Sequence, residues 1–163
     1  MKRRSAPRRR PKKSRSATRA KRLAASPGGN SSSEIRLSLG LEMTVEKIVP
    51  HEWTLAHFDP RLPAVFSTPA MIGMMEHAAA QAVLPELPPG AITVGTRIEV
   101  DHLKAVTTGA AVRATARLVK HKGRFLVFEV EARSGENAIG RGYVYRAIVE
   151  PVKFHAKAQT HAS

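Results

Sequence analysis

The feature that most constrains the fold is an apolar segment at residues 68–83, TPAMIGMMEHAAAQAV. Its methionine, alanine and valine residues recur at helical spacing, which is typical of a buried helix face. Thr68 and Pro69 form a common helix start, with the hydroxyl residue as N-cap and proline in the first turn. Pro85 ends the run, because proline cannot continue a helix. The sequence therefore predicts a long helix capped by Thr68, which other elements must cover.

One carboxylate, Glu76, interrupts this apolar segment. Burial of a carboxylate is costly unless the charge is paired or used in chemistry. An ion pair with Arg97 or Arg146 would account for Glu76 structurally. The cost of burial also makes the segment a candidate for catalysis, and both interpretations stay open.

Alternation of apolar and polar residues predicts strands around this helix. We expect one strand before the helix, with a kink near Gly40, and four after it: residues 35–49, then 92–104, 112–118, 125–133 and 139–149. A single apolar helix with an antiparallel meander is an α+β pattern, a curved sheet wrapped around a central helix. The edges of such a sheet need protection, and side-by-side dimerisation is a common solution.

Charge is distributed unevenly along the chain. Residues 1–33 contain 12 of the 27 Lys and Arg residues and no Asp or Glu. We expect a disordered basic tail there, a folded domain at 34–155 and a C-terminal tail at 156–163. Three interpretations of the basic tail stay open: a solvated extension, an arm that contacts nucleic acid non-specifically through phosphates, or an organelle transit peptide.

Composition excludes several classes of site. The chain has no cysteine, so it offers neither a disulfide framework nor a thiolate metal site. His51, His57 and His77 lack metal-ligand spacing, and we expect no metal and no redox cofactor. No apolar run approaches the ~20 residues of a membrane helix. We expect a cytoplasmic protein without membrane contact, with organelle import through the basic N-terminus left open.

Three separated motifs occur in register: residues 66–76, FSTPAMIGMME, then Val94-Gly95-Thr96, then Val100-Asp101-His102. In this combination the sequence resembles the hotdog-fold thioesterases, and most of all the fluoroacetyl-CoA thioesterase group, over roughly residues 37–154. The resemblance implies a hotdog fold. It also implies hydrolysis of a small or medium acyl-CoA to the acid and free CoA.

The resemblance assigns catalytic roles to Thr68, Glu76 and His102 and substrate contacts to Gly95 and Arg146. Taken singly, each residue also has a structural interpretation. Thr68 can be an N-cap, Glu76 a member of an ion pair and His102 an ordinary strand histidine. Gly95 can be a bulge glycine and Arg146 an exposed strand charge. The loop that precedes the helix departs from the family's phenylalanine-rich lid. The resemblance therefore does not extend to fluoroacetyl selectivity.

The chemistry of thioester hydrolysis fits these residue types. The helix N-terminus offers backbone N–H groups to a developing oxyanion. Glu76 can act as a nucleophile or as a general base on water. His102 can orient its neighbours or protonate the leaving group. Thr68 can hold the attacking water or act as a nucleophile, and the sequence leaves these roles open.

Spacing along the helix adds a constraint. Thr68 and Glu76 are eight positions apart, which is about 12 Å along an α-helix. We therefore expect a homodimer with the acyl-CoA site at the subunit interface. Two alternatives are a non-catalytic module that binds acyl-CoA in the same pocket, and a hotdog domain tethered to nucleic acid by its basic arm.

Overall fold

The computed structural model describes residues 35–152 and 154–155. The tails expected at 1–33 and 156–163 lie outside the described residues. The helices and strands, in chain order, are β1 (Glu42–Ile48), η1 (His51–Trp53), α1 (Leu55–Phe58), α2 (Thr68–Val83), η2 (Leu84–Glu86), β2 (Ile92–His102), β3 (Ala111–Lys122), β4 (Phe125–Ser134) and β5 (Asn137–Val149).

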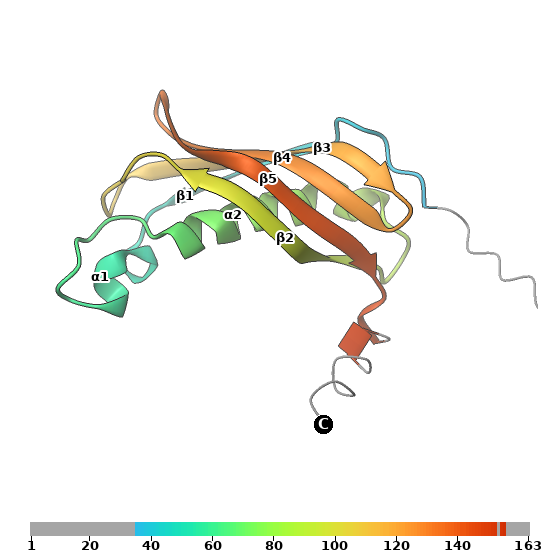
Figure 1. Ribbon diagram of the computed structural model, residues 1–163, viewed down its shortest axis with the longest axis horizontal. Helices are drawn as coiled ribbons and strands as arrows, with labels where there is room; N and C mark the ends of the chain where they lie inside the picture. Colours follow the sequence, from blue (N-terminus) through green and yellow to red (C-terminus); the bar gives the residue numbers. More distant parts are fainter. Residues whose placement is uncertain (1–34, 153, 156–163) are drawn as a thin grey trace, which may run out of the picture. The chain divides into compact units, whose positions relative to one another are not determined.

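The five strands form one antiparallel sheet in the order β1-β3-β4-β5-β2. The sheet arches over α2, which runs along its inner face (Figure 1). This is the predicted α+β architecture, with the long helix covered by the sheet. The order leaves β1 and β2 as the two edge strands.

The core lies between α2 and the inner face of the sheet. Met71, Met74 and Met75 are buried on the helix side, opposite alternate residues of β3 and β4 such as Leu118 and Phe128. Burial of one such side chain contributes about 1.5–3 kcal/mol before the entropy cost of ordering it. The periodicity that predicts the helix therefore reflects the contacts that hold it.

The strand boundaries follow the predicted turns. Gly123 and Gly135 adopt positive φ angles of 58° and 55° in the two hairpins that join β3 to β4 and β4 to β5. The first strand is shorter than predicted and begins at Glu42. Gly40 has a φ of 89° and lies in a turn. The expected kink within a strand is therefore a turn that precedes the strand.

The helix cap also differs from the prediction. Ser67 is the N-cap, in extended conformation, and its Oγ accepts a hydrogen bond from the Ala70 N–H at 3.4 Å. Thr68 is already the first helical residue. The prediction of Thr68 as N-cap was therefore wrong by one position, because the preceding serine performs the same task. This leaves the Thr68 hydroxyl for another partner.

Loop contacts bring the start of α2 next to the end of β2. Val65 forms an isolated antiparallel bridge with Thr107. The Phe66 N–H donates to the Val106 carbonyl at 2.7 Å. The segment before the helix is therefore tied to the segment after β2, although about 40 residues separate them in the chain.

Among the described residues, no helix combines the length and apolar character needed to cross a bilayer.

Candidate active site

The start of α2 and the end of β2 meet in a hydrogen-bonded pair. Thr68 Oγ1 lies 2.8 Å from His102 Nδ1. Thr68 is the first residue of the helix and His102 the last residue of the strand. The loop contacts described above fix both ends. Two of the three predicted catalytic residues therefore touch directly.

The second ring nitrogen of His102 differs from the first in its contacts. Its Nε2 atom is buried and forms no hydrogen bond to the described residues. A buried polar atom without a partner costs about 1–3 kcal/mol, so such atoms are rare unless a ligand or water meets them. In either neutral tautomer, Nε2 is a donor or acceptor available to a substrate while Nδ1 engages Thr68.

The first turn of α2 offers one backbone donor. Pro69 has no N–H, and the N–H of Ala70 is bonded to Ser67. The Thr68 N–H has no hydrogen-bond partner among the described residues. This N–H group is a candidate for the predicted oxyanion role of the helix N-terminus, because a free amide at the positive end of a helix favours a developing negative charge.

Glu76 lies halfway along α2 and pairs with Arg146 of β5. Arg146 Nη1 donates to Glu76 Oε1 at 3.0 Å. The two partners differ in exposure, since the Arg146 side chain is 8% exposed and that of Glu76 is 33% exposed. Burial lowers the pKa of the Arg146 guanidinium below its ordinary value, and the Glu76 carboxylate partly offsets this. The carboxylate is thus held at one oxygen and partly open to solvent.

This ion pair settles two of the structural interpretations. The pairing of Glu76 is with Arg146, whereas Arg97 pairs with Glu99. The interpretation of Arg146 as an exposed strand charge is wrong, because the residue is buried. Its predicted contact with substrate stays a prediction.

Thr93 of β2 belongs to the same cluster, although the sequence analysis did not single it out. Its side-chain oxygen accepts from Arg146 Nε at 2.9 Å and its carbonyl from Arg146 Nη2 at 2.8 Å. The sequence carries little signal for this role, since a threonine on a strand is ordinary. Only its buried position between the exposed Ile92 and the half-buried Val94 is consistent with it.

Gly95 lies against the carboxylate of Glu76. A Cβ atom at this position would collide with Glu76 Oε1. Gly95 pairs with Arg146 across β2 and β5, and the register shifts between Gly95 and Arg97. The glycine therefore borders a β-bulge, as its structural interpretation predicts, and also leaves the space that Glu76 occupies.

The five predicted site residues thus form two separate clusters. Thr68 contacts His102 at the start of the helix, and Glu76 contacts Arg146 and Gly95 in the middle. Because α2 is a continuous α-helix from Thr68 to Val83, the two clusters are about 12 Å apart along its axis.

A surface cleft opens beside the Glu76 cluster. It has a volume of about 310 Å³ and is lined by Glu76, Gly95, Thr96, Arg97 and Ile98. Four of these residues belong to β2, whose outer edge pairs with no other strand among the described residues. Glu76 is therefore reached from the free edge of the sheet.

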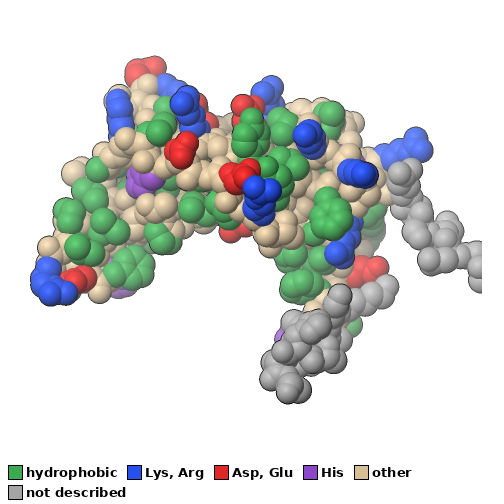
Figure 2. Space-filling model, viewed as in Figure 1, with side chains coloured by type: hydrophobic (Ala, Val, Ile, Leu, Met, Phe, Trp, Pro, Cys, Tyr) green, Lys and Arg blue, Asp and Glu red, His purple; other side chains and the backbone are tan. Residues whose placement is uncertain are grey.

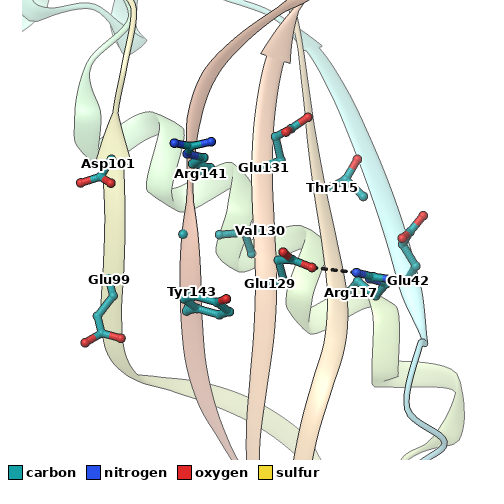
Figure 3. Close-up of a pocket in the computed structure, with 11 residues that line it drawn as sticks. Glu42, Glu99, Asp101, Thr115, Arg117, Glu129, Val130, Glu131, Arg141 and Tyr143 are labelled. Atoms are coloured by element: carbon teal, nitrogen blue, oxygen red, sulfur yellow. Dashed lines mark hydrogen bonds and ion pairs between the residues drawn. The ribbon is translucent and has the colours of Figure 1, made fainter.

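A larger hollow lies on the sheet face turned away from α2 (Figure 3). It has a volume of about 650 Å³ and is lined by charged side chains, including the Arg117–Glu129 ion pair. None of the five predicted site residues lines it. We therefore place the candidate active site on the helix side of the sheet and at its β2 edge.

Comparisons with known proteins identify the family of this chain. Residues 49–152 match the family model described as fluoroacetyl-CoA-specific thioesterase. The fluoroacetyl-CoA thioesterase of Streptantibioticus cattleyicolor is 36% identical over 129 residues, which cover 76% of this chain and 93% of that protein.

Solved structures give the same result. A structure of the fluoroacetyl-CoA thioesterase superposes with a TM-score of 0.72 at 36% identity, over 77% of this chain and 97% of that one. A Thermus thermophilus protein of the thioesterase superfamily superposes with a TM-score of 0.70 at 29% identity, over 78% of this chain and 98% of that one. The predicted hotdog fold and the predicted resemblance are confirmed, and this chain belongs to the fluoroacetyl-CoA-specific thioesterase family.

Proposed function

We propose that this chain hydrolyses small or medium acyl-CoA thioesters to the acid and free CoA, in a homodimer whose active sites each take groups from both subunits. The observation that carries this proposal is the position of Glu76. Its carboxylate is held by Arg146, partly exposed, and accessible through a cleft at the free edge of β2. Such a group can activate water or attack a carbonyl carbon.

The free edge also supports the dimer. β2 presents 11 residues at an unpaired edge, including the exposed side chains of Ile92 and Ile98. An edge of this kind is a template for pairing with another chain. A second copy related by a twofold axis would pair antiparallel with it, as is common in symmetric dimers.

One register of such a pairing would bring the two clusters together. If the twofold axis lies between Ile98 and Glu99, Gly95 of one copy is opposite His102 of the other. Gly95 adjoins Glu76, and His102 is bonded to Thr68. One carboxylate and one Thr68–His102 pair would then meet at each of two equivalent sites.

Hydrolysis in this site needs no group beyond these residues and water. Oxygen adds to the thioester carbonyl carbon, either from a water deprotonated by Glu76 or from Glu76 itself before water completes the reaction. The Thr68 N–H can donate to the carbonyl oxygen as negative charge develops there. The C–S bond then breaks, and a proton passes to the CoA thiolate, for which the free ring nitrogen of His102 is suited.

The size of the acyl group is proposed from the relatives. One structure of the fluoroacetyl-CoA thioesterase is a mutant in complex with acetyl-CoA, and another is a mutant in complex with fluoroacetate and CoA. In this chain, hydrophobic side chains gather over the end that carries α1 (Figure 2), where Phe58 and Leu62 are exposed. We propose that this end contacts the acyl group.

The test is CoA release by the full chain from a panel of short, medium and aryl acyl-CoAs. Because the chain has no cysteine, a thiol reagent reports only the CoA produced. Turnover that collapses in the Glu76→Gln variant is the expected result. Acyl-CoA binding without turnover would instead indicate a non-catalytic binding module.

We propose a cytoplasmic location. We also propose, on charge alone, a secondary contact with nucleic acid through residues 1–33. Twelve Lys and Arg residues without a single Asp or Glu favour phosphate contacts. Deletion of residues 1–33 should abolish a salt-sensitive affinity for double-stranded DNA and leave CoA release unchanged. Equal DNA binding by both forms would reject this contact.

A further inference from the structure

Thr93 occupies a buried position on β2, two residues before Gly95. It is 9% exposed and lies on the inner face of the sheet, toward the helix. Its partner, Arg146, is buried as well. The two residues therefore form a buried polar pair, in which each hydrogen bond constrains geometry strongly.

The guanidinium of Arg146 is fixed on two sides. Nε and Nη2 donate to the hydroxyl and the carbonyl of Thr93, while Nη1 donates to Glu76 Oε1. Two bonds to one residue set the plane of a rigid, planar group. With that plane set, the direction in which Nη1 points is set too.

We propose that Thr93 is a positioning residue for thioester hydrolysis, which acts through Arg146 to hold the Glu76 carboxylate toward the cleft. The inference rests on the proposed function and deepens it. Arg146 then orients Glu76, a role beyond the substrate contact implied by the resemblance. Gly95 completes the arrangement, because its missing side chain leaves room for the carboxylate.

Thr93 offers two acceptors to Arg146, its hydroxyl and its backbone carbonyl. Of these two, only the hydroxyl can be removed by a substitution that leaves the backbone unchanged. Thr93→Val has nearly the same shape and deletes the acceptor of the Nε–H. Thr93→Ser keeps the acceptor and deletes a methyl group. Comparison of these two variants therefore separates the effect of the hydrogen bond from the effect of packing. Thr93→Ala supplies a second hydroxyl-free variant if valine impairs folding.

The experiment measures kcat and KM for CoA release by the full-length wild type, Thr93→Val, Thr93→Ala and Thr93→Ser. We expect kcat to fall about 10-fold in the two hydroxyl-free variants, with KM within about twofold, because orientation of a reacting group affects the transition state more than substrate binding. Thr93→Ser should stay within about twofold of wild type. An unchanged kcat in Thr93→Val, an equal loss in Thr93→Ser, or a rise in KM alone would each overturn the proposal.

A second measurement tests the route through Arg146. In an Arg146→Lys background, Thr93→Val should change kcat by less than about twofold, because residues that act as a unit have non-additive effects. A full 10-fold loss in that background would contradict the route. The proposed function fails separately, when Glu76→Gln retains wild-type turnover. The positioning role alone fails when Glu76→Gln loses turnover and Thr93→Val does not.

Discussion

The two ends of the site differ in how completely their polar groups are satisfied. At the start of α2, Thr68 is exposed and its partner His102 keeps one ring nitrogen without a hydrogen bond among the described residues. Beside the middle of α2, Arg146 of β5 is buried and bonded on three nitrogen atoms. The first end can offer groups to a ligand, whereas the second holds a charge in place.

This difference indicates a division of work within a single helix. Donors and acceptors without a protein partner are suited to bind a substrate carbonyl and a leaving group. A buried guanidinium bonded at all three nitrogens is suited to fix a carboxylate, because rearranging it would leave buried donors without acceptors. Variants at each end therefore test different parts of the account.

The largest effect is expected for Glu76→Gln. Glutamine keeps the size of the side chain and an oxygen that can accept from Arg146, but it cannot take a proton from water. We expect kcat to fall about 10³-fold, within the range of general-base contributions. Stopped-flow CoA release checks this, with thermal unfolding as the control for folding. A loss of less than about 10-fold would remove Glu76 from the chemistry.

A smaller loss is expected for Thr68→Val. This change deletes the hydroxyl that meets His102 Nδ1 at 2.8 Å and keeps the shape of the side chain. We expect kcat to fall about 10²-fold and Thr68→Ser to retain most of the activity. Steady-state kinetics on both variants decide the matter. An unchanged kcat in Thr68→Val would show that the hydroxyl is dispensable.

Two glycines sharpen the comparison between positioning and folding. At Gly95, an added Cβ meets the flexible end of the Glu76 side chain, so Gly95→Ala should lower kcat about 10-fold with little change in melting temperature.

At Gly142, an added Cβ meets the backbone of Glu99 and Val100. Gly142→Ala should therefore destabilise the fold by about 1–3 kcal/mol.

Calorimetry and kinetics on both variants separate these outcomes. A large drop in melting temperature for Gly95→Ala would mean that its effect on activity arises from folding. A wild-type melting temperature for Gly142→Ala would show that the strands separate at low cost.

The smallest effect is expected for Gly73→Ala, on the exposed side of α2. Its Cβ would meet nothing within 4 Å. Alanine should stabilise the helix by about 0.5–1 kcal/mol and raise the melting temperature by about 1–4 °C, with unchanged kcat. A lower melting temperature would indicate that this face is covered in the assembly.

Much of the fold could be predicted because local patterns and tertiary packing agree. The methionine and alanine periodicity sets the length of α2, and the alternation of β3 sets its two faces. The cap was misplaced because Ser67 and Thr68 are equivalent on composition. Backbone conformation, which composition does not encode at adjacent hydroxyl residues, decides between them.

The site was less accessible to prediction. The pairing of Thr68 with His102 and of Glu76 with Arg146 depends on contacts between residues 34 and 70 positions apart. Their family resemblance identifies them, but their grouping into two clusters follows from the fold. Thr93 went unnoticed because its role depends on the exact direction of the Arg146 side chain.

The central claim, a site shared between two subunits, is tested most directly by mixing two inactive variants. Thr68→Val and Glu76→Gln subunits are co-expressed with different tags, and CoA release is measured for the mixture and for each variant alone. If Thr68 and Glu76 of one site come from different subunits, each hybrid dimer regains one intact site. Random assortment then predicts about a quarter of wild-type activity. Purified hybrid dimers that show no more activity than the parent variants would contradict the account.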